Sequence, residues 1–173
     1  ESDENNNIFY LPQSLTVIAP LPDLTITAGS FTPSTVSPGG RVTYTVDMAN
    51  IGSADQGQPE TFLLSGFLEM PGYWIIPLGG NNRTNLAAGE TRTTEYPFRS
   101  ADQTWGFTIP DSVEGVPLEP GTYRLRARID TDDQVAESDE DNNWFDFPEP
   151  LIVVPTPLPD LTITAGSFTP STV

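Results

Sequence analysis

The chain lacks the residue types on which most hydrolytic active sites and zinc sites depend. Its 173 residues include no cysteine and no histidine, which excludes disulfides, thiol nucleophiles, Cys–His zinc sites and the usual general base. Lysine is also absent: all seven basic residues are arginine, and with 24 acidic residues the formal charge is −17. Such a surface repels phosphate, so we expect no nucleic acid partner. Catalysis would have to rely on carboxylates alone, and we expect no enzyme.

Long hydrophobic runs are missing as well. No stretch reaches the ~18 apolar residues of a membrane-spanning helix, and the sequence predicts no membrane insertion. The acidic first residues, ESDENNN, lack the basic and apolar regions of a signal peptide. We therefore expect the chain to be a piece of a longer protein.

A 17-residue segment occurs twice without a mismatch. PLPDLTITAGSFTPSTV fills positions 20–36 and again 157–173, and an identity of this length does not arise by chance. The first nine residues, ESDENNNIF, also match ESDEDNNWF at 137–145 at most positions. The sequence therefore predicts a tandem array of units of about 137 residues. This chain would contain the tail of one repeat (1–19), one complete repeat (20–156) and the start of a third (157–173).

Prolines mark the junction between two units. Pro155, Pro157 and Pro159 fall within five residues, which favours polyproline II and restricts the freedom of the chain. We expect these three prolines to form a stiff contact between neighbouring repeats.

Apolar and polar residues alternate with the period of β-strands, and no long amphipathic helical pattern is present. Turn signals such as Ser37–Gly40, Leu78–Asn81 and Glu119–Gly121 separate the alternating segments. The sequence predicts an all-β fold, an Ig-like antiparallel β-sandwich of about seven strands. The expected strands lie at 24–27, 42–48, 62–70, 90–98, 123–129 and 144–154. The segment 100–117 is expected to be an insertion whose apolar residues cap one end of the sandwich.

Several motifs resemble one bacterial family. These are PDLTI at 22–26, VDMANIG at 46–52, LAAGE at 86–90 and VAESDEDNN at 135–143. Together they resemble the CARDB domain, the cell-adhesion-related domain found in bacteria, over nearly all of 22–154. The resemblance implies a seven-stranded sandwich, usually non-enzymatic, repeated in tandem in bacterial or archaeal surface proteins. This unit is longer than a typical member, mainly through 71–85 and 100–117.

Seven carboxylates fall within the twelve residues 130–141, in the expected hairpin between the last two long strands. Calcium takes six to eight oxygen ligands on flexible loops, so this cluster is a candidate calcium site. The first candidates as ligands are Asp130, Asp132, Glu137 and Asp139. The alternative is a solvated acidic turn in which the Asn side chains satisfy backbone groups.

An arginine row and a group of aromatic residues are the other candidates for contact. Alternation places Arg124, Arg126 and Arg128 on one sheet face. They would dock an acidic partner or another copy of the chain, or pair with acids on neighbouring strands. Four aromatic residues, if exposed, could stack on the sugar rings of a surface polysaccharide, and if buried would fill the ends of the sandwich. They are Tyr73, Trp74, Trp105 and Phe107.

These observations predict a repeat unit of a long extracellular fibre, filament or adhesin stalk, secreted or held at the cell surface. Its partners would be neighbouring repeats of the same chain. An alternative assembly has the incomplete segments 1–19 and 157–173 donating strands to other molecules. A different class of function would be an extracellular carbohydrate-binding adhesion module.

Overall fold

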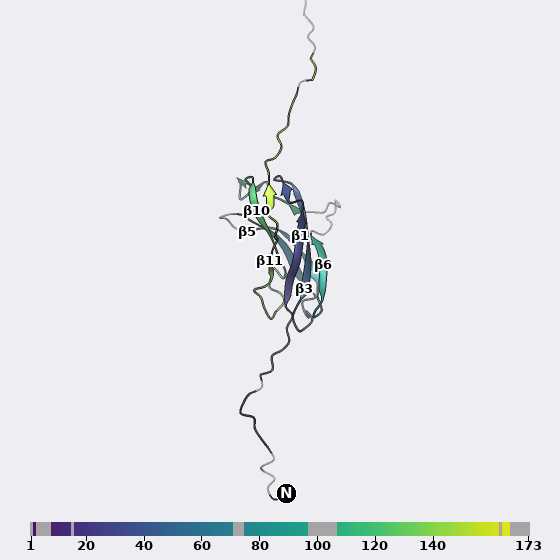
Figure 1. Ribbon diagram of the computed structural model, residues 1–173, viewed down its shortest axis with the longest axis vertical. Coiled ribbons are helices and arrows are strands. Elements are labelled where there is room, and N and C mark those ends of the chain that lie inside the picture. Colours follow the sequence, from purple (N-terminus) through teal and green to yellow (C-terminus); the bar gives the residue numbers. More distant parts are fainter. Residues whose placement is uncertain are drawn as a thin grey trace, which may run out of the picture.

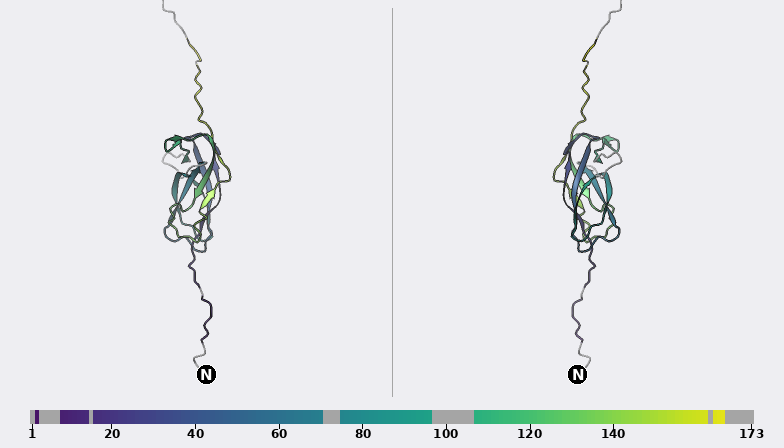
Figure 2. Two further views of the ribbon diagram at one scale, coloured as in Figure 1. Left: turned by 90° about the vertical axis from the view of Figure 1, so that its left-hand side faces the viewer. Right: turned by 90° about the vertical axis from the view of Figure 1, so that its right-hand side faces the viewer.

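The computed structural model describes residues 2, 8–14, 16–70, 75–96, 107–162 and 164–166. One β-sandwich occupies the middle of the chain, and the two flanking segments leave it at opposite ends of its long axis (Figures 1 and 2). In the described residues before Leu24 and after Val153 there is no strand. We call the end where residues 20–23 arrive the incoming pole, and the end where Val154 and Pro155 leave the outgoing pole.

Two sheets face each other. The first sheet has the order β1-β3-β6, with β7 paired to β3, and the second has the order β2-β12-β10-β4-β5, with β11 paired to β10. The strands of the first sheet are β1 (Leu24–Thr32), β3 (Arg41–Asn50), β6 (Thr91–Tyr96) and β7 (Phe107–Thr108). Those of the second are β2 (Thr35–Val36), β4 (Thr61–Glu69), β5 (Ile75–Thr84), β10 (Gly121–Arg128), β11 (Trp144–Asp146) and β12 (Leu151–Val153). A separate hairpin joins β8 (Ser112–Val113) and β9 (Val116–Pro117).

The predicted all-β sandwich is confirmed, and nearly all strand pairs are antiparallel. The exception is β2, which runs parallel to β12. In β3 the alternating residues Val42, Tyr44, Val46 and Met48 are each at most 1% exposed, as the period of two predicts. In the described part of the chain no helix has the length and apolar character needed to cross a bilayer.

The prediction of a turn at Leu78–Asn81 is wrong. These residues lie inside β5, a full strand whose Gly79 and Gly80 pair with Gly66 and Ser65 of β4. The ladder shifts register beside Gly66, and Gly79 adopts a φ of 111°. A Cβ on Gly80 would lie 2.3 Å from the Ser65 hydroxyl. Glycine is therefore required here by the irregular ladder and by the close approach of the Ser65 side chain, and not by a turn.

The closing segment and the insertion also differ in detail from the expectation. Residues 144–154 form two short strands on β10, with Pro148 and Pro150 in the gap between them, since proline cannot donate to a ladder. In the insertion, Phe107 and Ile109 are 5% and 0% exposed and join the core, which confirms that this part caps the sandwich. Trp105 lies outside the described residues.

Candidate metal centre at the incoming pole

The acidic hairpin 129–143 connects β10 to β11 at the incoming pole, as the sequence predicts. Its first acid, Asp130, is 0% exposed and has a φ of 45°. Its carboxylate accepts hydrogen bonds from the backbone N–H groups of Gln134 (3.2 Å) and Val135 (2.9 Å). Asp130 therefore closes the first turn of the hairpin, in the way that Asp side chains satisfy backbone donors.

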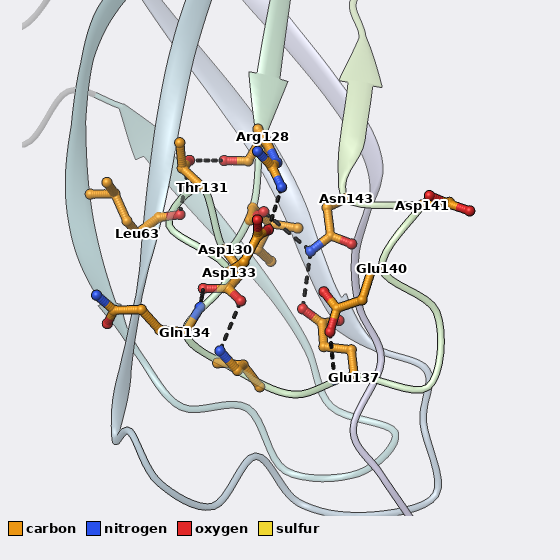
Figure 3. A network of polar contacts seen from close by, with 12 residues as sticks. Leu63, Arg128, Asp130, Thr131, Asp133, Gln134, Glu137, Glu140, Asp141 and Asn143 are labelled. Atoms are coloured by element: carbon orange, nitrogen blue, oxygen red, sulfur yellow. Dashed lines mark hydrogen bonds and ion pairs between the residues drawn. The ribbon is translucent and has the colours of Figure 1, made fainter.

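Three carboxylates of this hairpin converge. One oxygen each of Asp130, Glu137 and Glu140 lies within 4.8 Å of the other two, and Glu137 is only 8% exposed. The side chain of Asn143, 0% exposed, donates from Nδ2 to Glu137 Oε1 (3.0 Å), while its Oδ1 has no hydrogen-bond partner among the described residues. Figure 3 shows the Asn143 amide above the carboxylates of Glu137 and Glu140. We call these four residues the carboxylate pocket.

Within the described residues no arginine forms an ion pair with the carboxylates of the pocket, so their charge is not balanced. The pKa of Glu137 is raised to about 7, mainly by burial and also by the neighbouring charges of Glu140 and Asp130, while hydrogen bonds from Leu24 N and Asn143 act in the opposite direction. The one arginine on the adjoining strand end, Arg128, pairs with Asp133. An uncompensated buried carboxylate is a costly arrangement.

The stability of the ion-free protein should therefore fall as the pH rises. The folded state holds the Glu137 proton up to about pH 7, whereas the unfolded chain releases it near the ordinary carboxyl pKa of 4.5. Between these values the folded state binds more protons, so the fold loses up to about 3 kcal/mol as the pH rises through this window. Urea unfolding in metal-free buffer at pH 5 and pH 8 measures this loss. Other acids also titrate in this range, so the same measurement on Glu137→Gln is the reference. The unfolding free energy of this variant should fall less between pH 5 and pH 8 than that of the unchanged protein. An equal fall in both proteins would contradict the prediction.

The chemistry of the pocket suits a hard divalent cation. Its three converging carboxylates are oxygen ligands, the type that calcium prefers. Asn143, whose Nδ2 faces Glu137, carries in Oδ1 a further oxygen that has no partner among the described residues. Of the four residues predicted from the sequence, Asp130 and Glu137 meet here. Asp132 and Asp139 are exposed and lie outside the group, and Asp139 Oδ1 accepts a hydrogen bond from Asp141 N (3.0 Å). Sequence reasoning did not single out Glu140 and Asn143, which the structure places beside Glu137.

The acidic hairpin also holds the arriving chain. Glu137 Oε2 accepts a hydrogen bond from Leu24 N, the first residue of β1. Ser138 N donates to Pro22 O (2.9 Å), and the Asp23 carboxylate accepts from Ser138 Oγ (3.0 Å) and Asn142 Nδ2 (2.7 Å). The hairpin therefore contacts three consecutive residues of the arriving segment.

A second anchor, which the sequence did not reveal as such, is Asn50. Its side chain is 0% exposed. Oδ1 accepts from Asp23 N (3.0 Å) and Gly52 N (3.1 Å), and Nδ2 donates to Ala54 O (2.9 Å) and Leu86 O (3.1 Å). The following loop adds backbone bonds from Ser53 N and Ala54 N to Leu21 O (3.1 and 3.3 Å). The VDMANIG motif thus ends in residues that fasten the incoming segment.

The predicted arginine row lies on the outer face of β10. Arg124 is within 3.8 Å of Glu69 and 3.7 Å of Asp146, and Arg126 pairs with the same two acids. Arg126 and Arg128 also lie over the Trp144 ring, at 4.6 and 5.6 Å from its centroid. This is the cross-strand pairing that the sequence left open as the alternative to docking. A contact of the row with a partner stays a prediction.

The junction prolines and the aromatic group are placed as follows. Pro155, Pro157 and Pro159 are exposed in the outgoing segment, and their contact with a next repeat stays a prediction. Phe107 is buried against Tyr44, with ring centroids 6.0 Å apart, so it offers no face to a sugar. Tyr73, Trp74 and Trp105 lie outside the described residues.

Comparison with known structures supports the fold. The chain is similar to the CARDB domain of a Pyrococcus furiosus protein solved in complex with di-metal ions, with 18% identity over 81% of this chain and 100% of that one and a TM-score of 0.51. It is also similar to a domain of a protein assigned to the cell surface of Methanosarcina acetivorans (21% identity, 78% and 93% coverage, TM-score 0.49). A β-glucosidase of Erythrobacter marinus matches over 77% of this chain but only 16% of its own length (12% identity, TM-score 0.42). No curated protein matches the chain.

The family assignment agrees with the resemblance of the motifs. The CARDB family model matches residues 21–147, a range that contains both sheets except β12, together with the whole carboxylate pocket. CARDB is a non-catalytic family of adhesion-related modules of surface proteins. The chain belongs to the CARDB family.

Proposed function

We propose that residues 20–156 are a structural spacer, one repeat unit of a long extracellular fibre or adhesin stalk, secreted or held at the cell surface. The observation that carries this proposal is the position of the two ends. The chain arrives at one pole of the sandwich and leaves at the other (Figure 1). Units joined in this way add their lengths, because each new unit begins where the previous one ends.

Firm attachment of both ends supports the same function. At the outgoing pole Val154 N donates to Val36 O (2.9 Å) and Ser37 Oγ to Pro155 O (3.4 Å). At the incoming pole Leu21 O accepts two backbone N–H groups. Because both linkers are hydrogen-bonded to the sandwich, the orientation of one unit restricts the orientation of the next, and the units do not rotate freely about the joint.

The paired state of the terminal strands favours a covalent rod over strand donation. β1 makes a ladder of eight residue pairs with β3, and β12 is paired with both β10 and β2. A donated strand would have to displace one of these, since the positions it would fill are taken. Segments 1–19 and 157–173 then belong to the neighbouring repeats of the same chain.

Small-angle scattering tests the spacer. We expect a tandem chain with residues 20–156 present twice to give a maximum dimension close to twice that of one unit, with a narrow distribution of shapes. Polyproline character at Pro155, Pro157 and Pro159 restricts bending between the units. A compact or broad distribution would show that the units fold back on each other, and the spacer function would then be wrong.

The carboxylate pocket adds a second component, a bound calcium ion. Three converging carboxylates favour it, together with the buried Asn143 Oδ1, which has no partner among the described residues. A ligand that binds only the folded state at 100 times its Kd stabilises by about 2.7 kcal/mol, which for a domain of this size raises Tm by roughly 8 °C. Calorimetry in Ca²⁺ and in chelator measures the shift. An unchanged melting midpoint would show that calcium does not bind the folded domain.

A carbohydrate-binding module is the alternative function. Phe107 gives it no support because this ring lies in the core. A glycan array with the full chain tests it directly: specific retention of one polysaccharide class would establish the module, and no binding would leave the spacer.

A further inference from the structure

The joint between two repeats is very short. The last hydrogen-bonded residue at the outgoing pole is Pro155. Because 157–173 repeats 20–36, Leu158 corresponds to Leu21, whose carbonyl is bonded at the incoming pole. Only Thr156 and Pro157 then lie between two anchored positions. Three Cα steps span at most about 11 Å, so consecutive units nearly touch.

The stiffness of such a joint depends on how firmly the incoming segment is held. The backbone of Pro22 and Leu24 is held by Ser138 and Glu137 of the acidic hairpin, and Asp23 by Ser138 and Asn142. Anything that fixes this hairpin also fixes the angle at which the preceding unit meets the sandwich.

The same hairpin carries the unbalanced carboxylate pocket. Its Asp130 and Glu137 are buried, their oxygens lie within 4.8 Å of one of Glu140, and the buried Asn143 Oδ1 beside them lacks a partner within the described residues. Figure 3 shows that Glu137 and Glu140 come from the part of the loop that passes next to the arriving chain. A carboxylate oxygen has two lone pairs, so Glu137 can bind a cation and still accept the Leu24 N–H.

We infer that a divalent cation in the carboxylate pocket locks the incoming segment and thereby sets the stiffness of the joint between consecutive repeats. This rests on the proposed spacer function and its cation site. With the cation, two of the three carboxylate charges of the pocket are offset and the hairpin clamps Pro22 to Leu24; without it, mutual repulsion of the three carboxylates loosens the clamp. The rod would stiffen when calcium is present outside the cell and soften when calcium is removed.

Amide hydrogen exchange on the full chain, with Ca²⁺ or chelator, tests the lock. Exchange at Leu24 and Ser138 requires local opening of the clamp. If this opening releases the ion, Ca²⁺ at 100 times its Kd should slow exchange at these two amides roughly 100-fold. The Val154 amide at the outgoing pole should respond much less and is the internal control.

Two variants with the same charge change separate the lock from a general effect of charge. Glu140→Gln keeps an oxygen that can accept from Glu137 N but removes a ligand charge, so it should abolish the calcium response. Asp132→Asn, in the same hairpin but outside the pocket, should keep it.

Calcium titration by calorimetry distinguishes the possible failures. Binding without slower exchange at Leu24 and Ser138 would overturn the lock and leave the cation site in place. No binding would overturn both the site and the lock, whereas the spacer is judged separately by scattering in chelator. An equal response of Glu140→Gln and Asp132→Asn would overturn the assignment of the ligands.

Discussion

Replacement of Asn50 by alanine is expected to lower the free energy of unfolding by about 3 kcal/mol. The change removes four hydrogen bonds and leaves Asp23 N, Gly52 N, Ala54 O and Leu86 O without their side-chain partner. Each buried bond contributes about 1 kcal/mol, and an orphaned buried group costs more than the lost bond. Urea or thermal unfolding of the variant measures the loss.

Asn82→Ala is the matched control for this prediction. Asn82 lies on β5 with an exposed side chain, so the same truncation should change the unfolding free energy by less than about 0.5 kcal/mol. If the two variants unfolded at the same midpoint, the network of Asn50 would not stabilise the sandwich as the geometry indicates.

The class of fold could be predicted because it depends on a local property. Alternation along β3 and β10 places Val42 to Met48 and Tyr123 to Ala127 in the core, and the period of two is visible in the sequence itself. The opposite faces follow from the same rule, which is why the arginine row was placed correctly. β5 was not predicted because Gly79 and Gly80 are residues typical of a turn. Glycine is needed here because these positions pair closely with Gly66 and Ser65 of the neighbouring strand β4, which the sequence does not show.

The carboxylate pocket could be predicted only in part. Density of charge identified the hairpin, but spacing alone does not tell which acids turn inward. Asp130 does so because its carboxylate caps the backbone of Gln134 and Val135. Glu140 stays exposed, but its carboxylate is held beside Glu137 because it accepts from Glu137 N (2.9 Å). These are tertiary consequences of the turn. The partial repeat at 1–9 has the same residues at the positions of Glu137, Glu140 and Asn143 (Glu1, Glu4 and Asn7), but it keeps Asp139 as well, as Asp3, and so does not tell these acids apart.

Motifs that carry the family resemblance gather at the incoming pole. VDMANIG contains Asn50 and Gly52, which contact the incoming residues 21–24. VAESDEDNN supplies Glu137, which accepts from Leu24 N, and Asn143, which holds Glu137. In a modular rod the core of each unit tolerates many apolar combinations. The joint needs particular polar atoms at particular distances, so its residues form short recognisable motifs.

Gly52→Ala should have the second large effect, and it should act on the joint. A Cβ at this position would lie 2.5 Å from Asp23 N, 2.5 Å from Leu21 O and 2.5 Å from Pro22 C. All three are backbone atoms of the incoming segment, so none can swing aside as a flexible side chain would. The segment must therefore move and lose bonds such as Ile51 N to Asp23 O (2.7 Å). We expect a loss of about 3 kcal/mol from strain and broken hydrogen bonds.

Gly57→Ala in the same loop is the control, because a Cβ there meets no atom of the described residues within 4 Å. It makes the same chemical change and should leave stability unaltered or slightly raised, since alanine restricts the unfolded chain. In a tandem chain, Gly52→Ala should also broaden the distribution of shapes in scattering, whereas Gly57→Ala should not. A destabilised Gly52→Ala protein that still gave a narrow, extended distribution would show that the incoming segment does not set the angle between units. The stiffness of the rod would then have to come from the prolines of the linker alone.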